Sequence, residues 1–203
     1  MRVSMRLAAA AVLAAGTAGA ADAAVVVNVA QVGANVVATT TGTLNLTGLT
    51  SQGAFSLSRG IISNFAYVAT GATDGVTVTG YSGLTGPTAF GSSSTYVGAT
   101  SGTGSSFAIN GSGFGSPYVF VATDYVSGGL LAGTSVFANQ TFASLGLATG
   151  SYLFSSGNDT VTVNVLATAV PEPAGWAMMI GGMGVVGFAL RRRRVARTTV
   201  SFA

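Results

Sequence analysis

Three aspartates are the only carboxylates in the central part of this 203-residue chain, and they limit the chemistry that its side chains can perform. Asp74, Asp124 and Asp159 are widely separated in sequence, whereas glycoside hydrolysis needs two carboxyl groups about 5 to 9.5 Å apart. Asp74 and Asp159 stand in Asp-Gly and Asn-Asp turn sequences, which account for them without a catalytic role. Calcium loops need dense, regularly spaced acids, and the sequence has no such run.

The missing residue types exclude further chemistry. The sequence has no cysteine, no histidine and no lysine. It therefore lacks thiolate and imidazole nucleophiles, zinc ligands of these types, Schiff-base lysines and the phosphate-binding lysine of P-loops. We expect a protein that is not an enzyme and that has no catalytic residue, no metal site and no cofactor.

The positive net charge of +3 comes from the two ends of the chain. Between Val25 and Val170 the sequence has one arginine, Arg59, and the three aspartates, so this central part carries a net charge of −2. A nucleic-acid surface needs a basic stripe across a folded face. The sequence therefore predicts no nucleic-acid partner.

Residues 1–23 have the pattern of a cleavable signal peptide. Arg2 and Arg6 form a positive start, 7–15 is a short apolar run, and the small residues after it offer cleavage near Ala20 or Ala23. The alternative, an N-terminal membrane anchor, is disfavoured because the alanine-rich run is too short to span a bilayer well. We expect signal peptidase to process this end.

The C-terminal segment has three parts in a fixed order. Pro171, Glu172 and Pro173 form an extended stretch, 174–190 contains only apolar residues and glycine, and 191–197 is rich in arginine. Seventeen helical residues reach about 25 Å, the short end of a transmembrane helix. Arg191, Arg192, Arg193 and Arg194 would stay in the cytoplasm, and 198–203 would form a short cytoplasmic tail.

This segment resembles the PEP-CTERM sorting signal, in the variant that carries Trp176 and Ala177 after the Pro-Glu-Pro motif. The resemblance covers about 170–194 and implies recognition by an exosortase, a membrane-embedded enzyme that removes the C-terminal helix near the motif. It also implies export across the inner membrane, a transient membrane anchor with a cytoplasmic C-terminus, and a final place at the cell surface or outside the cell. Proteins of this kind are often associated with exopolysaccharide and biofilm.

Residues 24–169 are predicted to form one all-β domain, a β-sandwich of immunoglobulin-like or jelly-roll-like form. Short runs of β-branched and aromatic residues alternate with turn sequences and show almost no helical period. The run 147–152 resembles the corner motif of immunoglobulin-like sandwiches, in which a tyrosine hydroxyl, here Tyr152, caps a strand crossing. The predicted strands are 25–32, 36–46, 54–57, 65–69, 76–81, 107–110, 117–125, 134–142, 151–155 and 160–166.

The glycine- and serine-rich stretch 80–116 has two interpretations. The first is an irregular loop region, which this composition alone would produce. The second is a binding surface made of aromatic rings, which requires the rings to form one contiguous exposed patch. The candidate rings are Tyr81, Phe90, Tyr96, Phe114 and Tyr118.

Three classes of function follow from these observations. The first is a non-catalytic, exported surface or matrix protein whose partners are signal peptidase, an exosortase, the inner membrane and extracellular polysaccharide. The second is a carbohydrate- or ice-binding module that uses a flat Thr/Ser-rich sheet face, with rows at Thr39, Thr40, Thr41, Thr43, Thr77 and Thr79. The third, an unusual enzyme, requires the fold to bring two aspartates together in a pocket. We favour the first.

Overall fold

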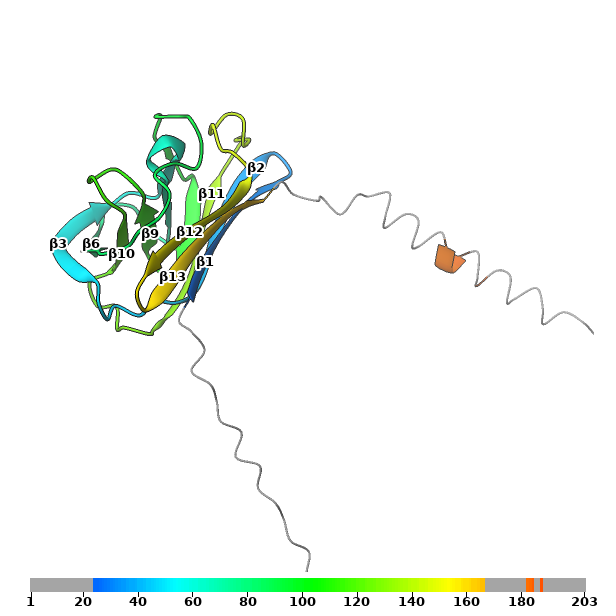
Figure 1. Cartoon of the computed structure of the whole chain (residues 1–203). Helices are drawn as coiled ribbons and strands as arrows, with labels where there is room; N and C mark the ends of the chain where they lie inside the picture. The colour runs from blue at the N-terminus through cyan, green and yellow to red at the C-terminus, as the bar shows by residue number, and fades with distance from the viewer. Residues whose placement is uncertain (1–23, 167–181, 185–186, 188–203) are drawn as a thin grey trace, which may run out of the picture.

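The computed structural model describes residues 24–166, 182–184 and 187 (Figure 1). Within 24–166 the chain forms two β-sheets and one short 3-10 helix, an arrangement that fits the predicted β-sandwich. In spatial order the first sheet contains β12 (Gly150–Ser156), β13 (Asp159–Leu166), β1 (Ala24–Val32), β2 (Asn35–Thr43), β11 (Leu130–Phe137) and β8 (Ser101–Gly104). The second contains β3 (Thr50–Leu57), β6 (Val76–Ser82), β10 (Tyr118–Ala122), β9 (Phe107–Asn110), β5 (Tyr67–Thr70), β4 (Gly60–Ile62) and β7 (Val97–Gly98).

The first sheet is built around the hairpin of β1 and β2. Gly33 sits in its two-residue turn at a φ of +59°, a conformation that glycine adopts without strain. On its other side β1 pairs in parallel with β13, the last strand of the domain. Burial alternates along β1, β2 and β13, so one face of this sheet points into the core and the other toward solvent.

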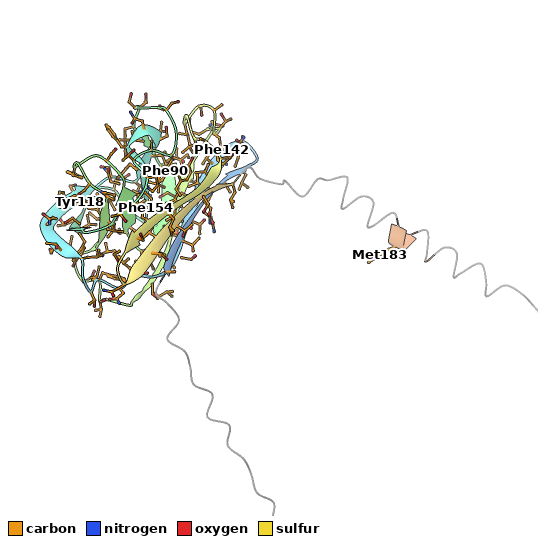
Figure 2. The ribbon with its side chains drawn as sticks, viewed as in Figure 1. Phe90, Tyr118, Phe142, Phe154 and Met183 are labelled. Atoms are coloured by element: carbon orange, nitrogen blue, oxygen red, sulfur yellow. The ribbon has the colours of Figure 1, made fainter. Side chains whose placement is uncertain are left out.

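The main core lies between the two sheets. The first sheet contributes valines from β1 and β13 together with Phe137 and Phe154, and the second contributes residues such as Phe107, Ile109 and Val121. Burying each of these side chains stabilises the fold by about 1.5–3 kcal/mol relative to leaving it exposed. In Figure 2, Phe90 and Phe154 lie within the body of the domain, and their ring centroids are 6.1 Å apart in an edge-to-face arrangement.

The second sheet is curled. Its strands β3 and β4 stand five places apart in the strand order, which would separate them by about 24 Å in a flat sheet. Only Ser58 and Arg59 join them, and the three steps from Leu57 to Gly60 reach at most about 11 Å. The sheet must therefore bend until the end of β3 approaches β4, and the Tyr67 hydroxyl of β5 donates a hydrogen bond to the Ser58 carbonyl across this gap.

The curl encloses a second, smaller hydrophobic cluster on the face that points away from the first sheet. Its buried members are Leu57, Ala69, Val78, Ala108 and Phe120. The second sheet therefore buries side chains on both faces, which explains why β5, β9 and β10 have almost continuous burial instead of alternation. The two clusters share no buried residue.

Most of the predicted strands are present. The strand 107–110 is correct to the residue, and 25–32, 76–81, 151–155 and 160–166 each agree with a strand within one residue at either end. The strand predicted at 134–142 is wrong at both ends, because β11 runs Leu130–Phe137 and a turn follows it. The strand predicted at 65–69 starts too early, since Ser63–Phe65 form the 3-10 helix η1. The stretch 80–116 contains β7, β8 and β9.

Two tyrosines tie loops to the sandwich, and one of them was predicted. The Tyr152 hydroxyl lies 2.9 Å from the carbonyl oxygen of Ala148, four residues upstream, as a tyrosine corner requires. The Tyr125 hydroxyl, which the sequence did not indicate, accepts a 2.8 Å hydrogen bond from the Leu44 N–H and donates one of 2.6 Å to the Gly129 carbonyl. Burial raises the pKa of both phenols.

Candidate functional site

The residues predicted to direct sorting lie outside the described part of the chain. This holds for the motif residues Pro171, Glu172, Pro173, Trp176 and Ala177, for Arg191, Arg192, Arg193 and Arg194, and for Ala20 and Ala23 at the predicted signal cleavage region. Of the predicted membrane segment 174–190, the structure describes 182–184 and 187, which are helical. Among the described residues, no helix combines the length and the apolar character needed to cross a membrane.

Asp74 is held in an ion pair with Arg59. Its Oδ2 lies 2.9 Å from Arg59 Nη2, and its Oδ1 accepts hydrogen bonds from Nε at 3.2 Å and from the Arg59 backbone N–H at 2.7 Å. Hydrogen bonds from the Arg59 side chain lower the pKa of Asp74, so this carboxylate stays ionised at neutral pH. A carboxylate with these partners stabilises the β5–β6 turn and is a poor proton acceptor.

Asp159 and Asp124 occupy contrasting environments. Asp159 is 6% exposed at the start of β13, and its oxygens accept hydrogen bonds from the backbone N–H groups of Asn45 and Thr160. It thereby joins the end of β2 to β13, a role that the predicted turn sequence did not reveal. Asp124 is exposed in the turn after β10. Among residues 24–166, 182–184 and 187, no three acidic, histidine or cysteine side chains are grouped as metal ligands.

The predicted threonine rows do not form one surface. Thr40 is fully buried and its Oγ1 lies 2.7 Å from Thr70 Oγ1, a hydrogen bond that links the two sheets, so its assignment to an exposed row is wrong. Thr77 and Thr79 belong to β6 of the second sheet, whereas Thr39 and Thr41 belong to β2 of the first. The predicted set is thus divided between two sheets and the interior.

Thr39 instead belongs to a polar row that crosses the first sheet at right angles to its strands. The register places one residue from each of six described strands in this row: Ser151, Asn164, Asn28, Thr39, Thr134 and Thr103. The row is hydrogen-bonded at one end, because Asn164 Nδ2 donates to Asn28 Oδ1 at 3.0 Å and Ser151 Oγ donates to Asn164 Oδ1 at 2.8 Å. Its members are far apart in sequence, so only the strand order could reveal it.

Of the five rings predicted as a binding surface, two point inward. Phe90 is 1% exposed in the main core, and Tyr81 packs against the same core. Their inclusion was wrong, because an isolated aromatic in a glycine-rich stretch gives no indication of which face it occupies. Tyr96 and Phe114 are 45% and 51% exposed, and Tyr118 is partly buried on the outward face of the second sheet (Figure 2).

Two of these outward rings, Phe114 and Tyr118, belong to an aromatic cluster that the sequence did not define. Phe55 of β3 and Phe120 of β10 join Phe114 and Tyr118, with ring centroids 4.9 to 6.4 Å apart. Tilted and edge-to-face pairs at these distances are favourable by about 0.5–1.5 kcal/mol each. Gly80 is needed beneath the cluster, because a Cβ there would lie 2.6 Å from the Phe55 ring.

A shallow pocket of about 410 Å³ opens beside this cluster on the same face. It is lined by Ser56, Ser58, Ile62, Tyr67, Tyr96 and Asn110. Asn110 of β9 stands directly opposite Tyr118 of β10 in the register, so the pocket and the aromatic cluster are contiguous. We call the two together the outer site.

The polar groups of the outer site are held in fixed orientations. The Tyr96 hydroxyl donates to the Arg59 carbonyl at 2.8 Å, and its ring lies against Gly60, where a Cβ would come within 2.3 Å of it. Asn110 Oδ1 accepts from the backbone N–H groups of Ser112 and Gly113 at 3.1 and 2.6 Å, which identifies this atom as the oxygen. Burial raises the pKa of Tyr67 and of Tyr96, so both phenols are neutral at physiological pH.

The described part of the chain is thus a two-sheet β-domain with a partly polar, partly aromatic outer site, and the sequence places a three-part sorting segment directly after its last strand. The family model of the PEP-CTERM protein-sorting motif matches residues 169–194. The chain therefore carries a PEP-CTERM sorting motif, which implies export and recognition by an exosortase. No curated protein and no solved structure matches the chain.

Proposed function

We propose that this protein is a non-catalytic surface or extracellular-matrix protein that an exosortase releases from a transient membrane anchor. The observation that carries the proposal is the sorting motif at 169–194. It begins three residues after β13 ends at Leu166, so the β-domain is complete before the motif starts. An enzyme bound to an extended Pro-Glu-Pro segment at this position needs no unfolding of the domain.

The order of events follows from the charges and apolar runs of the two ends. Residues 1–23 direct export as a signal helix and are removed by signal peptidase near Ala20 or Ala23. Residues 174–190 then span the inner membrane as a helix, with 191–197 retained in the cytoplasm because arginine resists translocation. Cleavage near 171–173 frees the immunoglobulin-like or jelly-roll-like sandwich at the cell surface.

The absence of catalysis is part of this proposal. Asp74 is engaged by Arg59, and Asp159 by backbone N–H groups of two segments, so both carboxylates have structural roles. The exported domain would act by association with exopolysaccharide in a biofilm. Its weakly charged, hydroxyl-rich surface supports this, because the described residues 24–166 contain one arginine and three aspartates as their charged side chains.

The polar row of the first sheet favours a second candidate, a carbohydrate- or ice-binding module that uses this Thr/Ser-rich face. A row of side chains crossing six neighbouring strands repeats at about 4.8 Å and so presents a regularly spaced array. Replacing Thr39 and Thr134 by valine would remove hydroxyls from its centre while keeping their shape. Loss of binding to polysaccharide or to ice crystals in this double variant would support the candidate.

The sorting proposal is tested by variants of the motif in the native cell. Changing Glu172 to alanine should leave the protein in the membrane fraction with its C-terminal segment attached, whereas the unchanged protein should be found outside the cells. The matched control changes Asp159, a carboxylate of the folded domain, to asparagine: this variant should lose stability but should still be cleaved. Equal release of the Glu172→Ala variant and the unchanged protein would contradict the proposal.

A further inference from the structure

We propose that the outer site of the second sheet binds a neutral sugar unit of a polysaccharide chain. The inference deepens the proposed function, because it assigns the association with polysaccharide to particular residues. It stands on the geometry of the outer site and not on the sorting motif, so each can fail without the other.

The shape of the outer site fits one or two units of a chain that passes across it. Its volume of about 410 Å³ lies within the range of roughly 300–1,000 Å³ that is usual for ligand pockets, but the pocket is open and shallow. The curl of the second sheet encloses Ala69 and Ala108, which are fully buried, and the pocket opens to solvent beside this buried cluster. An open pocket admits a long polymer that an enclosed cavity would reject.

The outer site offers flat apolar surfaces to a ligand. Phe114 and Tyr96 are about half exposed, yet Tyr96 is fixed against Gly60 and Phe114 is fixed by contacts with Phe55 and Tyr118. Rigid exposed rings bind at a low cost in conformational entropy. A pyranose ring presents a face of C–H groups that can stack on such a ring while its hydroxyls remain at the edge.

Hydrogen-bonding groups stand where those hydroxyls would lie. Because Asn110 Oδ1 accepts from two backbone N–H groups, its Nδ2 is left as a donor that makes no hydrogen bond to another described residue. The phenol oxygens of Tyr67 and Tyr96 donate their protons to backbone carbonyls, which leaves their lone pairs as acceptors. Asn110 is 9% exposed and lines the pocket.

The electrostatics of the outer site favour a ligand without charge. The charged groups nearest to it are Arg59 and Asp74, which pair with each other at 2.9 Å. Neither is free to bind a uronate, a phosphate or an ammonium group without breaking this pair. The combination of fixed rings, an amide donor, phenol acceptors and no net charge is the chemistry that recognises a neutral hexose.

The test measures binding of three probes to the full chain in detergent: cellohexaose and xylohexaose, which are neutral, and polygalacturonate, which is acidic. We expect one neutral probe to bind, and we expect Tyr96→Ala or Phe114→Ala to weaken that binding about tenfold, the equivalent of one lost ring contact. The matched control is Leu153→Ala, because Leu153 is 55% exposed on the outward face of the first sheet. Thermal unfolding of each variant shows whether it is folded.

Three results would overturn the proposal. One is binding of neither neutral probe, a second is tighter binding of polygalacturonate than of the neutral probes, and a third is equal weakening of binding by Leu153→Ala and Tyr96→Ala.

If Thr39→Val with Thr134→Val abolishes binding and Tyr96→Ala does not, the sugar lies on the first sheet. If the probes fail to bind but Phe114→Ala releases a protein that co-purifies with the chain, the outer site is a protein interface. The molecular mass of the exported protein reports separately on sorting.

Discussion

The first sheet buries one face and exposes the other, whereas the second sheet buries side chains on both. On the exposed face of the first sheet a polar row crosses the strands, from Ser151 of β12 to Thr103 of β8. The outward face of the second is concave, with rings and a shallow pocket. The difference arises from one connection: two residues between β3 and β4 force the second sheet to curl, and the curl shelters apolar residues that a flat sheet would expose to water.

The contrast between the two hydrophobic clusters is tested by removing one phenylalanine from each. Phe154 is fully buried in the main core, so Phe154→Ala should lower the free energy of unfolding by about 3–5 kcal/mol. Phe120 is 4% exposed beneath the open aromatic cluster, where neighbouring rings can move inward, so Phe120→Ala should cost about 2–3 kcal/mol. Urea unfolding of both variants measures the difference. An equal loss would mean that the smaller cluster is packed as tightly as the main core.

The link between the sheets is tested at Thr40 and Thr70, whose hydroxyls lie 2.7 Å apart in the interior. Thr40→Val leaves the Thr70 hydroxyl buried without a partner and should cost about 1–3 kcal/mol. The double change to valine removes both polar groups and should cost less than the sum of the single changes. A double-mutant cycle from urea unfolding measures this coupling. Additive losses would show that the two hydroxyls do not depend on each other.

The two tyrosine contacts should differ in strength. Tyr125→Phe leaves the Leu44 N–H without its acceptor and also removes the bond to Gly129, so we expect a loss of about 1–2 kcal/mol. Tyr152→Phe removes only a bond to carbonyl oxygens, which tolerate the loss better, so we expect about 0.5–1 kcal/mol. Thermal unfolding of the two variants gives the order. A larger loss of stability for Tyr152→Phe than for Tyr125→Phe would show that the Tyr152 contact contributes more to the fold.

The smallest expected effect concerns pH and the Arg59–Asp74 pair. The folded-state pKa of Asp74 is lowered by the Arg59 side chain, so the pair contributes stability above the unfolded pKa of about 4, and this contribution is lost as the pH falls through the folded pKa. Asp74 is half exposed, so Asp74→Asn should cost about 1 kcal/mol or less at pH 7.

Urea unfolding at pH 7 and at pH 2 measures this pH dependence, and the difference in stability between the Asp74→Asn variant and the unchanged protein should be smaller at pH 2 than at pH 7. Asp124→Asn controls for the loss of one negative charge, because Asp124 is exposed in a turn. A difference that persists undiminished at pH 2 would show that the aspartate acts through something other than its charge.

The sequence predicts the first sheet better than the second, for physical reasons. Strict alternation in β1 and β13 reports a single buried face, and such a pattern can be read locally. In β11 the inward positions include Gly133 and Ser135, which are not apolar side chains, so the alternation of apolar and polar residues is not visible in the sequence. The strand was therefore predicted too far along the chain, at 134–142 instead of Leu130–Phe137. Strands β7 and β8 are short and rich in glycine, with a composition typical of loops.

The candidate site shows the same limit. The corner at Tyr152 was predictable because the tyrosine and the carbonyl oxygen it bonds are four residues apart. Tyr125 bonds Leu44 across 81 positions, and the outer site combines β3, β4, β5, β9 and β10, so strand order had to be known first. The sorting motif is contiguous in sequence, so it could be identified without knowing the fold, and the family model confirms it at 169–194.

The central claim, export followed by exosortase cleavage, is tested most directly by the intact mass and terminal peptides of the protein. They should be compared between native cells and cells that lack the exosortase. We predict that the protein outside native cells begins near residue 24 and ends near 171–173, and that cells without the exosortase retain a membrane-bound form containing 176–194. A native protein that keeps 176–194 and stays in the inner membrane would contradict the account, and the chain would then be a β-domain with a permanent anchor.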